Sequence, residues 1–375
     1  KSLTAPTLTG TAVVASLDIS GDIDVDGTTN LDVIDVDGAA NFAADVTFAD
    51  GADIITASAG TSNTRVGVNA GNSIQSGGNY NVAVGDEAGT ALTTADKSTA
   101  IGYGALAAAT TAGNNTAVGA NALAATTGQA NTGVGEGALE SNVAGTFNVA
   151  IGANTLDADT TGSKSVGVGY AALTTQNFST ATDSYNVAVG YESGTAITTG
   201  TQNTLLGSLS GDAVTTGIQN VAVGMNSLGA LTDADYNVAV GAYALDADTK
   251  GSQNTAIGYG TLSAQNLTTA TDSLNTAVGY LAGLSVTTGI RNTLIGGNSG
   301  DSITDADNNT AVGFNTLIDN VLGSKSVAIG SFALESQNPA TASDMHNVAV
   351  GVSAGGAITT GDQNNLIGGL AGDAL

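Results

Sequence analysis

The chain has 375 residues, including 53 glycines, no cysteine, no tryptophan and only 4% aromatic residues. This composition excludes disulfide and thiol chemistry and a core of large side chains, while 42% hydrophobic residues is too many for a solvated disordered chain. A net charge of −26 repels nucleic acid and anionic membrane surfaces, and no stretch approaches the roughly 18 apolar residues of a membrane helix, so we expect neither nucleic acid as a partner nor membrane insertion.

Residues 1–60 alternate apolar and acidic side chains, as in the run from Leu17 to Gly27. Glycines punctuate the pattern at Gly27, Gly38 and Gly51. Alternation with period two is typical of half-buried strands. We therefore predict an N-terminal acidic β stem over residues 1–60, separate from the rest of the chain. Because the sequence starts with Lys1 rather than Met, we interpret it as a fragment or a processed chain.

Asp22, Asp24 and Asp26 precede Gly27 in the spacing that opens an EF-hand calcium loop. That loop needs Glu at its twelfth position, where this chain has Val33, and flanking helices are not predicted. The three aspartates are therefore weak calcium candidates, better interpreted as the solvated face of a strand. The Asp-x-Asp pairs at 157/159, 233/235, 246/248 and 305/307 are likewise predicted to be solvated turns. We expect no other cofactor.

Residues 61–375 consist of one repeated unit. An aliphatic residue followed by glycine recurs about eighteen times, mostly at a spacing of 17 residues. The unit reads Asn-[Val/Thr]-Ala-[Val/Ile]-Gly, followed by a small residue with Leu or Gly, and often by Thr-Thr-Gly. Repeats of this length cannot bury their own apolar face alone, but stacked copies can.

The chemistry of one unit predicts a coil of a parallel β-solenoid, or β-roll. Its β-branched residues at alternate positions favour a short strand, and glycine ends that strand at a tight corner that needs positive φ or close backbone approach. The second apolar pair predicts a second short strand, and Thr-Thr-Gly predicts a closing turn. We therefore expect an all-β fold of about eighteen coils.

Stacking of identical coils places equivalent side chains above one another. Asn lies four residues before the corner glycine in 15 of 18 units, with Ser98, Ser165 and Ser326 as the exceptions. We predict a structural asparagine ladder. Its members include Asn81, Asn115, Asn131, Asn148, Asn186, Asn203, Asn220, Asn237, Asn254, Asn275, Asn292, Asn309, Asn347 and Asn364.

The strand has two uncharged faces, with Val or Thr and Val or Ile on one side and Asn and Ala on the other. A strand with small apolar residues on its second face is often covered there as well. We expect the Ala face to be covered by another copy of the chain in a parallel bundle.

Three coils are longer, with steps of 21 residues, and carry extra residues near Gln176-Asn177, Gln265-Asn266 and Gln337-Asn338. Insertions in solenoids map to one face as loops. We predict that these residues bulge outward as candidate contact loops. The alternative is a neutral bulge inherited by duplication of a block of coils.

The repeated Asn-[Val/Thr]-Ala-[Val/Ile]-Gly motif resembles the head repeats of trimeric autotransporter adhesins, which are left-handed parallel β-rolls. It also resembles repeats of bacteriophage tail fibres, in which shaft-like β segments similar to residues 1–60 precede such units. The resemblance covers residues 61–375 and implies a homotrimer. The repeat here is longer than the usual adhesin unit, which favours the phage-fibre interpretation.

No constellation in the sequence predicts catalysis. The single histidine, His346, is expected in an exposed loop, and the Gly-x-Gly strings are repeat corners without the helix of a dinucleotide site. We expect a non-enzymatic structural fibre, extracellular or on a virion, that presents a tip binding a host receptor. It would join other virion or surface proteins at both ends. The alternative is a bacterial surface adhesin head that itself binds host or cell surfaces.

Overall fold

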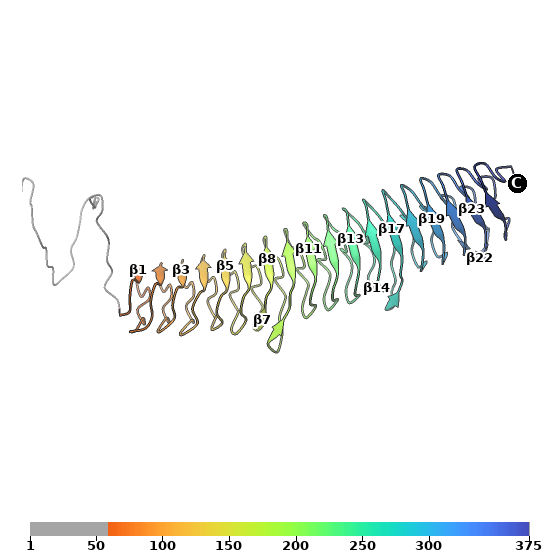
Figure 1. Ribbon diagram of the computed structural model, residues 1–375. Coiled ribbons are helices and arrows are strands. Elements are labelled where there is room, and N and C mark those ends of the chain that lie inside the picture. The colour runs from red at the N-terminus through yellow and green to blue at the C-terminus, as the bar shows by residue number, and fades with distance from the viewer. Residues whose placement is uncertain (1–58, 375) are drawn as a thin grey trace, which may run out of the picture. The chain divides into compact units, whose positions relative to one another are not determined.

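The computed structural model describes residues 59–374, which form a parallel β-solenoid of about eighteen coils (Figure 1). The described residues contain strands and turns and no helix, so the prediction of an all-β solenoid with a repeat of about 17 residues is confirmed. Asp22, Asp24, Asp26 and nearly all of the predicted stem over residues 1–60 lie outside the described residues.

Each coil contributes one three-residue strand, and consecutive strands pair in parallel without a shift in register. In one pair, for example, Ala222 lies opposite Ala239. The main sheet contains β1 (Thr64–Val66), β2 (Val82–Val84), β3 (Thr99–Ile101), β4 (Thr116–Val118), β5 (Thr132–Val134), β6 (Val149–Ile151), β8 (Val166–Val168), β10 (Val187–Val189), β11 (Thr204–Leu206), β12 (Val221–Val223), β13 (Val238–Val240), β15 (Thr255–Ile257), β17 (Thr276–Val278), β18 (Thr293–Ile295), β19 (Thr310–Val312), β21 (Val327–Ile329), β23 (Val348–Val350) and β24 (Asn365–Ile367).

The glycine that follows each strand is required for two reasons. Its backbone has positive φ, 146° at Gly207, a conformation that disfavours side chains. In addition, a Cβ atom at Gly207 would lie 2.5 Å from the carbonyl oxygen of Gly224 in the next coil. The predicted corner is therefore both a turn and a point where successive backbones touch.

The prediction of a second strand at the following apolar pair is wrong. That segment is a turn in which Leu adopts positive φ, 53° at both Leu123 and Leu228. This conformation is unfavourable for leucine in isolation. Here it turns the chain back and places a fully buried side chain in the core, while the Leu123 amide still donates to Ala138 of the next coil at 2.9 Å.

The core is thin, and its volume is balanced between rows. The middle residue of most strands is a fully buried Ala, packed beside the row that carries Leu or Gly. Where Leu205 replaces that Ala, the neighbouring row has glycine: Cβ atoms at Gly194 and Gly211 would lie 2.7 and 2.8 Å from its methyl carbons. The same exchange occurs around Leu294. Large and small residues thus alternate so that the interior stays close-packed.

Each 21-residue coil adds a two-residue strand at the lower edge, which pairs with one in the coil before it; Figure 1 shows two of these partners, β7 and β14, below the main row. These short strands also pair in parallel across successive coils. The pairs are β7 (Gly162–Ser163) with β9 (Thr182–Asp183), β14 (Gly251–Ser252) with β16 (Thr271–Asp272), and β20 (Gly323–Ser324) with β22 (Ser343–Asp344).

Candidate functional site

The outer face of the main sheet is a uniform surface that runs through all eighteen coils. We call the first and third residues of its eighteen strands the outward rows, since they point to solvent while the middle residue points inward. The outward rows contain Val, Thr, Ile and Leu with one Asn, and no charged residue. Ile101, Ile151 and Ile257 are 39%, 42% and 39% exposed. A continuous uncharged, largely apolar strip therefore runs along a strongly acidic chain.

The sequence predicted which residues share a face, but the face expected to meet another chain is the wrong one. Ala83, Ala150 and Ala222, like the other Ala residues at this position, are fully buried inside their own coil. Any copy of this chain packed against the sheet would meet the outward rows instead.

The fourteen predicted ladder asparagines occupy equivalent positions beside the alanine row, and all but the half-buried Asn364 are buried. The Oδ1 atom of one Asn accepts the backbone N–H of the ladder residue in the next coil, as from Asn220 to Asn203 and from Asn237 to Asn220, each at 3.0 Å. Its Nδ2 donates to the carbonyl three residues before that next ladder residue, as from Asn220 to Ala234 at 2.9 Å. The ladder thus joins side chain to backbone at nearly every step.

Direct bonds between side-chain amides occur in only part of the ladder. Asn220 Nδ2 donates to Asn203 Oδ1 at 3.2 Å, and Asn237 Nδ2 to Asn220 Oδ1 at 3.3 Å. At the serine positions Ser98, Ser165 and Ser326, the serine backbone N–H still donates to the Asn Oδ1 of the preceding coil, at 2.9 Å in each case.

The predicted contact loops divide into buried and exposed parts. Asn177, Asn266 and Asn338 are exposed, and they lead into exposed tips at 179–181, 268–270 and 340–342. Gln176, Gln265 and Gln337 were expected in the same outward loops but are fully buried, which corrects that prediction. Contact of the exposed asparagines with another molecule stays a prediction.

Each buried glutamine holds its inserted coil through hydrogen bonds in the interior. Its Oε1 accepts the side-chain amide of the next ladder residue at 2.8 Å in all three blocks, from Asn186, Asn275 and Asn347. In the first block, Gln176 Nε2 also donates to Asp159 at 2.6 Å and to Ser165 at 2.8 Å.

Two of the aspartates predicted in solvated turns, Asp159 and Asp248, are fully buried beside these glutamines. Burial raises the pKa of Asp159 above its ordinary value, although hydrogen bonds from Gln176 and the Gly162 amide partly oppose that rise. In the third block the equivalent residue is the neutral Asn320, which bonds the backbone of Gly323 in the same way. By contrast, Asp233 and Asp305 are exposed, as expected.

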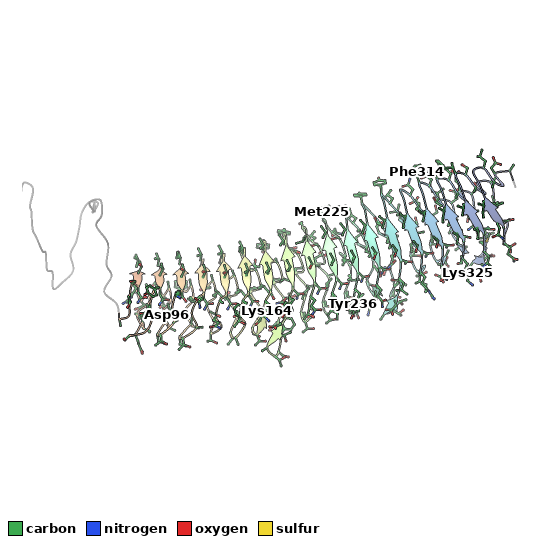
Figure 2. All side chains as sticks on the ribbon, in the orientation of Figure 1. Asp96, Lys164, Met225, Tyr236, Phe314 and Lys325 are labelled. Atoms are coloured by element: carbon green, nitrogen blue, oxygen red, sulfur yellow. The ribbon has the colours of Figure 1, made fainter. Side chains whose placement is uncertain are left out.

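The lower edge of the solenoid carries most of the described basic residues, and Figure 2 shows Lys164 and Lys325 on it with Tyr236. Lys164 pairs with Asp183 at 2.6 Å and Lys325 with Asp344 at 2.5 Å, both across consecutive coils. The expected exposure of His346, which occupies the same position in its coil, is confirmed.

The upper edge carries aromatic side chains that sequence reasoning did not single out. Met225 and Phe314, labelled in Figure 2, directly follow corner glycines, and so do two stacked tyrosine pairs. Tyr170 and Tyr191 have ring centres 5.5 Å apart, and those of Tyr259 and Tyr280 are 5.7 Å apart. Their signal was available: equivalent residues lie about 4.8 Å apart in stacked coils, so aromatic residues after consecutive corner glycines must meet.

Among residues 59–374, no group of three or more His, Asp or Glu side chains is placed to hold a metal ion. Within the same range, no helix of a length and apolarity suited to crossing a membrane occurs. In comparisons with known proteins, no family model matches the sequence and no curated protein is similar enough to be recognised as a relative.

Proposed function

We propose that this protein is a non-catalytic structural fibre whose solenoid acts as a stiff spacer. The observation that carries the proposal is the single sheet of eighteen strands, which continues in register through all three inserted coils. At about 4.8 Å per coil, eighteen coils span roughly 85 Å. Every coil is bonded to the next through strand and corner, and most coils also through the asparagine ladder, so bending at one place requires several hydrogen bonds to break together.

We propose further that the fibre is a homotrimer packed through the outward rows. The number three comes from the resemblance to adhesin heads and phage fibres, and the choice of face comes from the uncharged surface described above. Complete burial of a Val or Ile side chain contributes about 1.5–3 kcal/mol, so covering a residue that is 40% exposed contributes about 0.6–1.2 kcal/mol. Over eighteen coils these small terms favour one long interface.

The setting that we favour is a phage tail fibre or virion appendage, extracellular, that spaces or presents a tip binding a host receptor. The surface adhesin head stays the second candidate, supported by the three exposed loop tips that recur along one edge of the solenoid. Genes beside this one would separate the two settings, since tail and baseplate genes accompany a fibre and an outer-membrane anchor accompanies an adhesin.

The assembly is tested by light scattering coupled to size-exclusion chromatography, together with electron microscopy of the purified chain. The proposal expects about three times the 36.2 kDa chain mass and rod-shaped particles. Val223→Asp with Val240→Asp, which places charges in the outward rows, should lower the mass toward that of one chain. The matched control is Thr199→Asp with Thr216→Asp, which adds the same charge at exposed turns of adjacent coils. A wild-type monomer at all concentrations, or equal loss of assembly in both variants, would refute the proposed interface.

A further inference from the structure

A cleft of about 400 Å³ opens on the upper edge of the solenoid between the coils of β13, β15 and β17. Its lining combines two tyrosine side chains, one carboxylate, one serine hydroxyl and an aliphatic wall. The residues that matter for its chemistry are Tyr243, Asp246, Tyr259, Gly260, Ser263 and Leu281.

The cleft exists because one side chain is missing from a row. Tyr243, Gly260 and Leu281 each lie two residues after a corner glycine, in three consecutive coils. All three have positive φ and bond through their amides to the preceding coil, so their backbones are equivalent. Glycine in the middle adds no side chain of its own, so the Leu281 side chain reaches over it: a Cβ atom at Gly260 would lie 2.7 Å from Leu281 Cδ2. Other coils fill this position with Asn, as at Asn226 and Asn298.

The tyrosines form two aromatic walls at different angles. Tyr243 and Tyr259 meet edge to face, with ring centres 5.9 Å apart and an interplanar angle of 80°. Tyr259 also stacks on Tyr280, which supports it from the next coil. Both Tyr259 and Tyr280 are at least half exposed, so a ligand reaches the rings without displacing the core.

The carboxylate of Asp246 is incompletely compensated. Its Oδ1 atom is shielded from solvent and has no hydrogen-bond partner among the described residues. Burial raises the pKa of this group, which is the mark of a charge that lacks an opposite partner. No lysine or arginine lines the cleft, and the chain as a whole carries a charge of −26.

We propose that this cleft binds an organic cation, an alkylammonium or guanidinium group, held over the tyrosine rings and paired with Asp246. Aromatic faces attract such cations, and a nearby carboxylate in a strongly negative field adds to that attraction. A neutral sugar is the less suitable ligand, because the lining offers few polar groups for its many hydroxyls. Binding at this cleft requires neither the proposed fibre function nor a particular oligomeric state.

The test uses choline as the cationic probe and saturation-transfer NMR of the ligand, which detects weak binding to large particles. The neutral isostere 3,3-dimethyl-1-butanol has the same shape without the charge, and methyl α-glucoside represents sugars. Gly260→Asn places in the cleft the residue that equivalent coils carry, which also displaces the Leu281 methyl group lying against Gly260. Gly137→Asn makes the same change at an equivalent position without tyrosine neighbours and is the matched control.

We expect a choline signal with the wild type and with Gly137→Asn, and its loss with Gly260→Asn. Asp246→Asn should weaken binding about fivefold or more, in line with loss of the charge pair. The proposal is overturned if the neutral alcohol gives an equal signal, if the glucoside binds better than choline, or if Gly260→Asn leaves the choline signal unchanged.

Discussion

Removal of one ladder side chain, in the variant Asn220→Ala, tests how the coils are held together. The Asn220 amide accepts the backbone N–H of Asn237 and donates to the Ala234 carbonyl and to Asn203 Oδ1. Asn203, Asn220 and Asn237 are fully buried, and Ala234 is nearly so, which prevents water from replacing these bonds.

The expected cost depends on the groups that lose their partners. A buried donor or acceptor left unsatisfied costs about 1–3 kcal/mol, and the variant orphans at least the Asn237 N–H and the Ala234 carbonyl. We therefore expect a local destabilisation of about 2–5 kcal/mol. Because each coil contacts only its neighbours, the loss should be confined to the coils on either side of residue 220.

Hydrogen exchange followed by mass spectrometry measures this local stability better than a melting curve, since a long repeat array need not unfold in one step. Exchange near residues 203–237 should accelerate by about thirtyfold to several thousandfold, with little change in distant coils. Asn338→Ala, at an exposed side chain, should stay within about 0.5 kcal/mol of the wild type. Unchanged protection around Asn220, or a loss equal to that in the Asn338 variant, would refute a structural role for the ladder.

Two further substitutions probe the interior. Leu205→Ala should destabilise its coil by about 2–5 kcal/mol, because it opens a cavity between two glycines. The same exchange experiment measures this loss. Adding Gly211→Leu should restore part of the lost stability, and no restoration would contradict the proposed balance of core volume between the two rows. Asp159→Asn should remove a pH dependence. The folded-state pKa of Asp159 lies above its ordinary value of 3.8, so wild-type stability is highest below that value and falls as pH rises toward the folded-state pKa. In the variant, the stability of this coil should not change over the same pH range, as expected for the third block, which has the neutral Asn320 at the equivalent position. If the variant keeps the wild-type pH dependence of stability, groups other than Asp159 cause it.

The period, the strand and the corner could be predicted because each depends on local chemistry. The direction of the strand faces could not, because alternation separates two faces without saying which is inside. Because Val is larger and more apolar than Ala, we would expect the Val face of each strand to be buried, yet the Ala face is buried and the Val face is outward. At Gly133, a strand-middle position, an added Cβ would lie 3.2 Å from Leu123 Cγ, so the interior opposite a leucine has room for little more than a methyl group. Leu205 fits only where that leucine is replaced by glycine.

The buried acids were hidden for a similar reason. Asp-x-Asp is a common turn pattern, and Asp157 and Asp159 look equivalent in the sequence. In the coil, the position of Asp159 is an inward one that Val214 and Leu231 occupy elsewhere. Asp157 and Asp159, separated by one residue, therefore lie in different environments, and only the backbone path through the turn shows which of the two side chains points inward.

The inserted loops and the polar interior form one structural unit. Among the described buried ladder asparagines, only Asn254 lacks a backbone carbonyl as acceptor for its Nδ2, because the 21-residue coil displaces that carbonyl. Its Nδ2 donates instead to Asn237 Oδ1. In the other two long coils the same position is Ser165 or Ser326, which has no side-chain amide, and the buried glutamine bonds each serine. An insertion at this place therefore requires a polar partner inside the coil. The exposed tip is free of that requirement, so it is the part of each block in which sequence can change without cost to the fold.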